Sequence, residues 1–179
     1  MIDDINLMTM TGKTQQLIIN EIPRLRRYAH SLCMNREDGD DLVQSTLQRA
    51  LAKVGYWQKG TSIRAWLMTI MHNLFVNNLR SKKWTAAEPL NIDELPDPRG
   101  NESERRGLLL RDLDRGLTRL SAEHREALLL VGIEQYSYKE AASIAGISVS
   151  TLTSRLHRAR RELKSDMNEN DTSHIRRVK

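Results

Sequence analysis

The chain has 179 residues, a formal net charge of +5 and 39% hydrophobic residues, enough for one or two small domains with apolar cores. It opens with Asp3 and Asp4 instead of a basic and then apolar leader, and no apolar run approaches about 18 residues. These features exclude a signal peptide and a membrane span, so we expect a cytoplasmic protein. The single cysteine, Cys33, cannot form an internal disulfide, and its apolar neighbours predict a buried thiol.

Charge and proline divide the chain. Residues 1–84 carry 12 basic and 7 acidic side chains, residues 85–104 carry 1 and 6, and the remainder carries 15 and 10. Three of the four prolines lie in the acidic stretch, which predicts an extended, flexible linker. We therefore expect an all-α protein with two small helical domains. The predicted boundaries are a first domain over 14–84, the linker over 85–105, a second domain over 106–166 and a disordered polar tail over 167–179.

Helical spacing of apolar residues recurs three times in the first domain, which predicts a small helical bundle. A first helix contains apolar residues from Ile18 to Leu32. A second is expected to begin after the acidic run over 37–41, where carboxylates favour a helix N-terminus. A third is expected to start after Ser62.

Four helices are predicted in the second domain. The first covers Leu108 to Leu120, and Ser121 caps the second, which runs to about Val131. The third begins with a capping box, in which Ser137 and Glu140 satisfy each other's backbone N–H groups. Gly146 can adopt the left-handed conformation of a sharp turn, and Ser148 or Ser150 then caps the fourth helix. Two helices joined by a glycine turn are typical of a helix-turn-helix DNA-binding unit.

The last of these helices is amphipathic and basic. Leu152, Leu156, Ala159 and Leu163 form one apolar stripe that faces the protein. The side chains on the other side are Ser150, Ser154, His157 and Arg161, flanked by Thr153 and Arg158. An ordinary helical hairpin with a solvated basic face is the alternative, but the cap, the turn, the stripe and the basic density together favour contact with DNA.

Three segments in this order resemble the extracytoplasmic-function (ECF) group of bacterial RNA polymerase sigma factors. They are DDLVQSTL at 40–47, RAWLMTIMHNL at 64–74, and the helix-turn-helix ending in SRLHRAR at 154–160. The sequences of residues 23–26 (PRLR) and 58–66 (QKGTSIRAW) are similar to those of the EcfG-type general stress branch. The resemblance implies a sigma region 2-like domain and a sigma region 4-like domain that direct transcription initiation, at stress-response genes.

The resemblance also implies which residues carry that function. Asp40, Asp41 and Gln44 would dock on a basic coiled coil of core RNA polymerase, although the acids could instead serve only the helix dipole. The helix after Ser62 would read and melt the minus-ten promoter element. The residues expected to contact the bases of this element are Trp57, Asn73, Asn77 and Asn78. Those expected to contact the strand backbone are Arg80, Lys82 and Lys83.

By the same resemblance, the fourth helix of the second domain would read the minus-thirty-five element in the major groove. The expected base readers are Thr153, Ser154, His157 and Arg158, and the expected phosphate contacts are Thr151, Arg155, Arg160 and Arg161.

The expected partners are core RNA polymerase, promoter DNA and an anti-sigma factor, of a small soluble helical type in the EcfG branch and membrane-anchored in others. No enzyme activity, cofactor or metal is expected, since there is no glycine-rich phosphate loop and the five His and one Cys have no metal-ligand spacing. Two alternatives stay open: a stand-alone helix-turn-helix regulator and a sigma-like decoy for an anti-sigma factor. The acidic linker could mimic nucleic acid or be a plain spacer.

Overall fold

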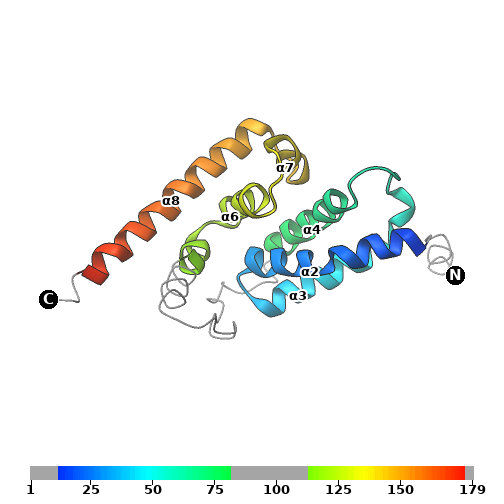
Figure 1. Ribbon diagram of the computed structural model, residues 1–179, viewed down its shortest axis with the longest axis horizontal. Helices are drawn as coiled ribbons and strands as arrows, with labels where there is room; N and C mark the ends of the chain where they lie inside the picture. Colours follow the sequence, from blue (N-terminus) through cyan, green and yellow to red (C-terminus); the bar gives the residue numbers. More distant parts are fainter. Residues whose placement is uncertain (1–11, 82–112, 176–179) are drawn as a thin grey trace.

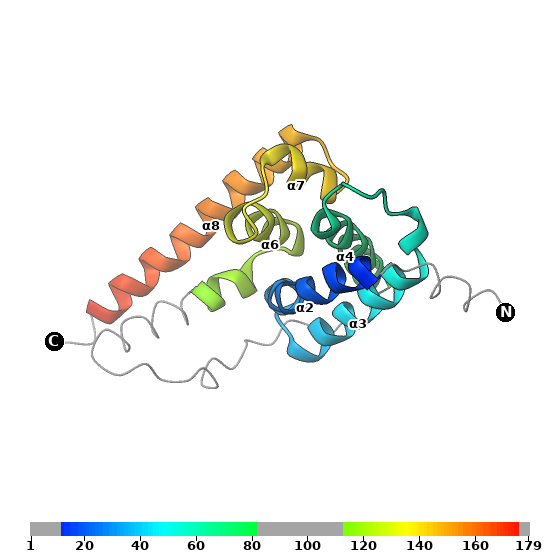
Figure 2. The same cartoon turned by 45° about the vertical axis from the view of Figure 1, so that its right-hand side comes forward.

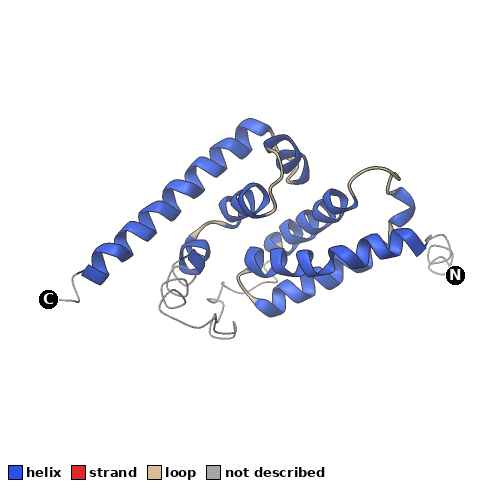
Figure 3. Cartoon of the chain, viewed as in Figure 1, coloured by secondary structure: helices blue, strands red, loops and turns tan. Residues whose placement is uncertain are grey.

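The computed structural model describes residues 12–81 and 113–175, with side chains described as far as 165 in the last helix. All regular structure in these ranges is helical, which confirms the predicted all-α class (Figure 3). The elements are α2 (Gly12–Cys33), α3 (Arg36–Ala52), η1 (Val54–Tyr56), α4 (Ile63–Arg80), α6 (Ala122–Leu128), η3 (Leu129–Ile133), α7 (Tyr138–Ile144) and α8 (Val149–Ile175). Residues 113–119 are also helical. The expected linker over 85–105 lies outside the described residues, and so do Lys82 and Lys83.

Helices α2, α3 and α4 form the first bundle (Figure 1). In α2 the predicted stripe is buried, with Leu25 and Leu32 fully inaccessible. Cys33 is buried as expected, and burial raises the pKa of its thiol to about 12. Ser62 caps α4, since its Oγ accepts a hydrogen bond from the Ala65 N–H at 3.1 Å.

The predicted start of the second helix is wrong. The acidic run does not precede α3 but forms its first turns, because Asn35 caps the helix one residue before Arg36. The Asn35 side chain accepts a hydrogen bond from the Asp38 N–H at 3.0 Å. The carboxylates therefore lie inside the helix end whose dipole favours them.

The second bundle has the predicted caps. Ser121 caps α6, and the helix then continues as one π-helical turn, η3. Ser137 and Glu140 form the capping box of α7, and Gly146 has a φ of +61°. Ser148 caps α8, because its Oγ accepts from the Thr151 N–H at 3.1 Å. Helix α8 continues past residue 166, where the sequence predicted a disordered tail.

The two bundles pack against each other instead of standing apart (Figures 1 and 2). Helix α4 contacts α7, and α2 contacts both α6 and η3. Buried residues of both bundles belong to one apolar cluster. Polar groups also cross the interface: Arg125 Nε donates to the Leu32 carbonyl at 2.9 Å, and His72 Nδ1 lies 2.6 Å from Glu126 Oε1. Within the described ranges no helix is long and apolar enough to cross a membrane.

Candidate functional site

The outward surface of α8 has the predicted arrangement. Leu152, Leu156 and Ala159 are almost completely buried on one side of the helix. The exposed side chains on the other are Ser150, Thr151, Thr153, Ser154, His157, Arg158, Arg160 and Arg161. The hydroxyls at the start of the helix bond to one another, since Ser148 Oγ lies 2.9 Å from Ser150 Oγ and 2.8 Å from Thr151 Oγ1. This surface offers hydroxyl, imidazole and guanidinium groups to solvent.

Arg155 differs from its neighbours on α8. Its side chain is only 22% exposed, and its Nη2 lies 3.0 Å from Glu123 Oε2 on α6. His124 also reaches α8, with Nδ1 3.3 Å from Glu162 Oε1. These two pairs hold α8 against α6, so Arg155 orients the helix whatever else it contacts.

A polar row follows α4. Asn73, Asn77 and Arg80 are exposed and lie four and three residues apart, on one face of the helix, while Asn78 is half-buried. Leu67, Met71 and Phe75 on the other side are buried in the core. The helix thus presents three of the four described candidates together.

A pocket of about 490 Å³ lies between α2 and the loop that leads into α4. It is lined by Leu17, Glu21, Arg24, Trp57, Gly60, Thr61, Ser62, Ile63 and Arg64. Trp57 is half-buried, and its indole Nε1 is buried without a hydrogen-bond partner. The pocket therefore combines an aromatic wall with two guanidinium groups.

The acidic end of α3 forms another candidate surface. Asp40, Asp41 and Gln44 are all exposed, and Gln44 is one helical turn from both acids. Asp40 is engaged within the chain: its Oδ1 lies 3.0 Å from His30 Nε2 and 3.3 Å from Arg26 Nε. Burial, followed by the charges of Glu37 and Asp41, raises the pKa of nearby Asp38. Asp41 and Gln44 are thus the groups most available to a basic partner.

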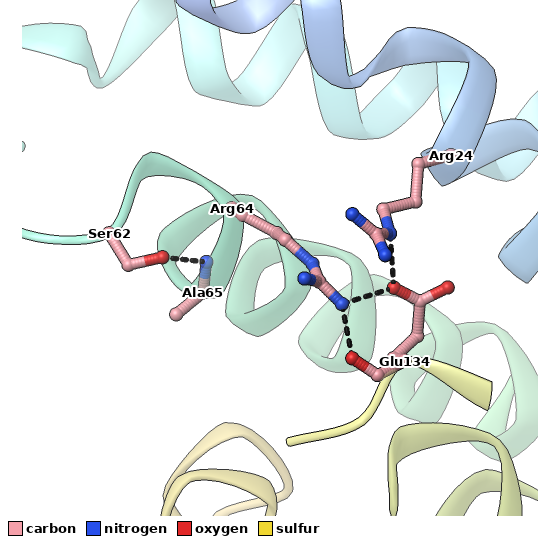
Figure 4. A network of polar contacts seen from close by, with 5 residues as sticks. All are labelled: Arg24, Ser62, Arg64, Ala65 and Glu134. Carbon is pink, nitrogen blue, oxygen red and sulfur yellow. Dashed lines mark hydrogen bonds and ion pairs between the residues drawn. The ribbon is translucent and has the colours of Figure 1, made fainter. Parts of the chain in front are cut away.

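Sequence reasoning missed a polar network centred on Glu134, the residue that follows η3 (Figure 4). The Glu134 side chain is 5% exposed, and its Oε2 lies 2.8 Å from Arg24 Nε and 2.6 Å from Arg64 Nη2. Arg64 Nη2 also donates to the Glu134 carbonyl, and its guanidinium carbon lies 4.6 Å from the ring centroid of Tyr136. Burial raises the pKa of Tyr136 to about 12. A single glutamate such as Glu134, between η3 and α7, has no sequence pattern that predicts an ion-pair network with distant arginines.

Comparison with known proteins identifies both bundles. Residues 18–72 match the family described as the Sigma2 domain of PhyR, and residues 110–163 match Sigma-70, region 4. The chain is 36% identical over 158 residues to the ECF RNA polymerase sigma factor EcfG of Rhodopseudomonas palustris, covering 88% of this chain and 87% of that protein. The chain is an ECF sigma factor. Sigma factors of this family bind core RNA polymerase and direct initiation at specific promoters.

Two solved structures resemble this sigma factor. The sigma factor RpoE of Bartonella quintana, in complex with the anti-sigma factor NepR, is 33% identical with a TM-score of 0.71, covering 88% of this chain and 98% of that one. CnrH, in complex with the cytosolic domain of CnrY, shares the fold at 24% identity and a TM-score of 0.65, covering 94% and 96%. No group of three or more His, Cys, Asp or Glu side chains in the described part of the sigma factor is placed to hold a metal ion.

Proposed function

We propose that this sigma factor reads its promoter through two exposed surfaces, the polar row of α4 for the minus-ten element and the outward face of α8 for the minus-thirty-five element. One observation carries the proposal: both helices bury apolar side chains in the core and expose most of the predicted polar residues, with Asn78 half-buried and Arg155 22% exposed. On α8, Thr153, Ser154, His157 and Arg158 read bases, while Thr151, Arg155, Arg160 and Arg161 contact phosphates. On α4, Asn73, Asn77, Asn78 and Arg80 contact the melted strand. Lys82 and Lys83, which come after α4 in the sequence, contact the backbone of the same strand.

The pocket beside Trp57 receives an unstacked base of the minus-ten strand. Its volume of about 490 Å³ falls in the usual range of ligand pockets, about 300 to 1,000 Å³. The indole ring offers a stacking surface in the wall of the pocket. Stacking on aromatic side chains stabilises single strands by about 1 to 3 kcal/mol for each base.

Core polymerase docks on the acidic end of α3. Asp41 and Gln44 offer a carboxylate and an amide to a basic surface, and Asp40 adds charge beside them. Complementary charge accelerates association and selects the partner more than it raises affinity.

The expected regulator is a small soluble helical anti-sigma protein. The complex of RpoE with the anti-sigma factor NepR supports an anti-sigma partner, and the likeness to EcfG supports a role in stress-response genes. The protein acts in the cytoplasm and is a specificity subunit with no catalytic activity of its own.

In vitro transcription with sigma-free bacterial core polymerase, on a library of promoter fragments, tests the proposal. We expect specific transcripts that require the protein, and a changed promoter choice when His157 is replaced by Ala. Asp41→Ala should lower transcription without changing promoter choice. Tight, symmetric DNA footprints without polymerase and without transcripts would support the stand-alone regulator instead, and neither binding nor transcripts would support the decoy.

A further inference from the structure

The Glu134 carboxylate reaches across the interface between the two bundles. It follows η3 of the second bundle, yet both of its cationic partners belong to the first: Arg24 on α2 and Arg64 on α4. The carboxylate is almost fully buried, whereas Arg24 is 40% and Arg64 is 23% exposed. If the bundles separated, the first bundle would retain two adjacent guanidinium groups with no anion between them.

Two guanidinium groups around one anion suit a phosphate as well as a carboxylate, since both offer oxygens to the planar N–H donors of arginine. The pair also lies where nucleic acid is expected. Arg24 and Arg64 line the same pocket as Trp57, and Arg64 occupies the first turn of α4, where free N–H groups and the helix dipole favour negative charge. Arg64 Nε is buried without a partner, so the site has a donor that Glu134 does not use.

We propose that Arg24 and Arg64 form a binding site for a backbone phosphate of the melted minus-ten strand, and that Glu134 occupies this site as an internal competitor while the bundles are closed. The inference deepens the function proposed above and rests on it. Single-stranded DNA and closure of the two bundles then exclude each other at these two arginines. Binding of the strand separates the bundles, and closure weakens binding of DNA by the free protein.

Binding of a fluorescein-labelled, random-sequence DNA 12-mer to the full chain, measured by anisotropy over a salt series, tests the competition. Glu134→Gln keeps the size of the side chain but removes its charge. We expect it to raise affinity at least about fivefold, the lower end of typical coupling between linked equilibria. The log-salt slope should steepen by about 0.7 for each phosphate gained. Small-angle scattering of the same variant should show a larger radius of gyration.

Two further variants separate competition from general effects of charge. Glu21→Gln removes a carboxylate from the same pocket but leaves both ion pairs of Glu134 in place, and it should change affinity much less. Arg64→Gln should also separate the bundles, yet lower affinity below that of the unchanged protein, because it removes part of the phosphate site. An interface contact with no DNA role would instead make Arg64→Gln raise affinity as Glu134→Gln does.

Equal affinities for Glu134→Gln and Glu21→Gln would overturn the inference, and so would a rise in affinity for Arg64→Gln. Circular dichroism confirms that each variant is folded, and the Arg64→Gln result decides the question if Glu134→Gln does not fold. Transcription by the unchanged protein provides the separate control. If it initiates specifically while the oligonucleotide predictions fail, the inference is wrong and the proposed function stands; if it never initiates, the proposed function itself fails.

Discussion

The capping box of α7 couples one carboxylate to the stability of the helix-turn-helix. The Glu140 side chain accepts from the Ser137 hydroxyl at 2.6 Å and from the Ser137 N–H at 2.9 Å. These two hydrogen bonds lower the pKa of Glu140 below its ordinary 4.5, and the bond from the hydroxyl has the larger effect. The folded protein thus keeps the carboxylate charged to a lower pH than the unfolded chain does. The stabilisation is present above about pH 4.5 and disappears as the pH falls through the folded pKa.

Glu140→Gln should therefore lower the free energy of unfolding at pH 7, and its difference from the unchanged protein should shrink as the pH falls below 4.5. Chemical denaturation at several pH values measures the difference. Glu37→Gln, an exposed acid in the first turn of α3, serves as the control for general charge. A difference between the unchanged protein and Glu140→Gln that did not vary with pH would show that the side chain acts through shape alone.

Gly39 lets helices α2 and α3 approach closely. A Cβ at this position would lie 2.5 Å from His30 Cδ2 and 3.1 Å from the His30 Cα. Gly39→Ala should lower the free energy of unfolding by about 1 to 3 kcal/mol, as other overpacking changes do. Because the closest atom belongs to the His30 ring, His30→Ala in the same chain should recover part of the loss. Denaturant unfolding of both single variants and the double variant gives the coupling, and strict additivity would contradict the contact.

Gly146 provides the comparison at the turn between α7 and α8. A Cβ there would have no neighbour within 4 Å, but its φ of +61° is unfavourable for other residues. Gly146→Ala should therefore cost about 1 to 2 kcal/mol through backbone strain, with no compensating partner mutation.

Two arginines of α8 differ in their surroundings. Arg160 is exposed, whereas Arg155 is mostly buried and pairs with Glu123. Arg160→Ala should weaken binding to all duplex sequences and lower the log-salt slope by about 0.9, the value for one lost phosphate contact. Arg155→Ala should in addition lower the melting temperature, because the pair with α6 is lost. Filter binding over a salt series and thermal denaturation measure the two effects. An unchanged slope for Arg160→Ala would remove this side chain from the proposed interface.

Across the whole molecule, the sequence predicted those features that depend on neighbours within a few turns. The capping box, the Ser62 and Ser121 caps and the turn at Gly146 are all local hydrogen bonds or backbone angles, and each is confirmed. The predicted start of α3 is wrong because Asn35, also a good cap, begins the helix before the acidic run. The packing of the two bundles was not predicted. Its polar contacts join residues 54, 70 and 93 positions apart, a distance over which periodicity and caps carry no information.

The pair of His72 and Glu126 allows a test of the closed arrangement apart from the Glu134 site. Both side chains are buried, at 12% and 4% exposed, and their nearest atoms lie 2.6 Å apart. Removing one partner of a buried hydrogen bond costs about 1 to 3 kcal/mol if the other is left buried and unsatisfied. Separation of the bundles lets His72 regain water, so Glu126→Ala should populate an open form with a larger radius of gyration in small-angle scattering.

A double change makes this test stringent. Replacing both partners of a buried hydrogen bond by apolar side chains of the same shape can be nearly neutral or stabilising. His72→Leu combined with Glu126→Leu should thus restore a compact scattering profile, while Glu126→Ala alone does not. Glu123→Ala, on the same helix and 66% exposed, should leave the profile unchanged. A compact profile for Glu126→Ala would mean that apolar packing between the bundles is enough for closure. An extended profile for the double variant would mean that the polar pair of His72 and Glu126 is specifically required.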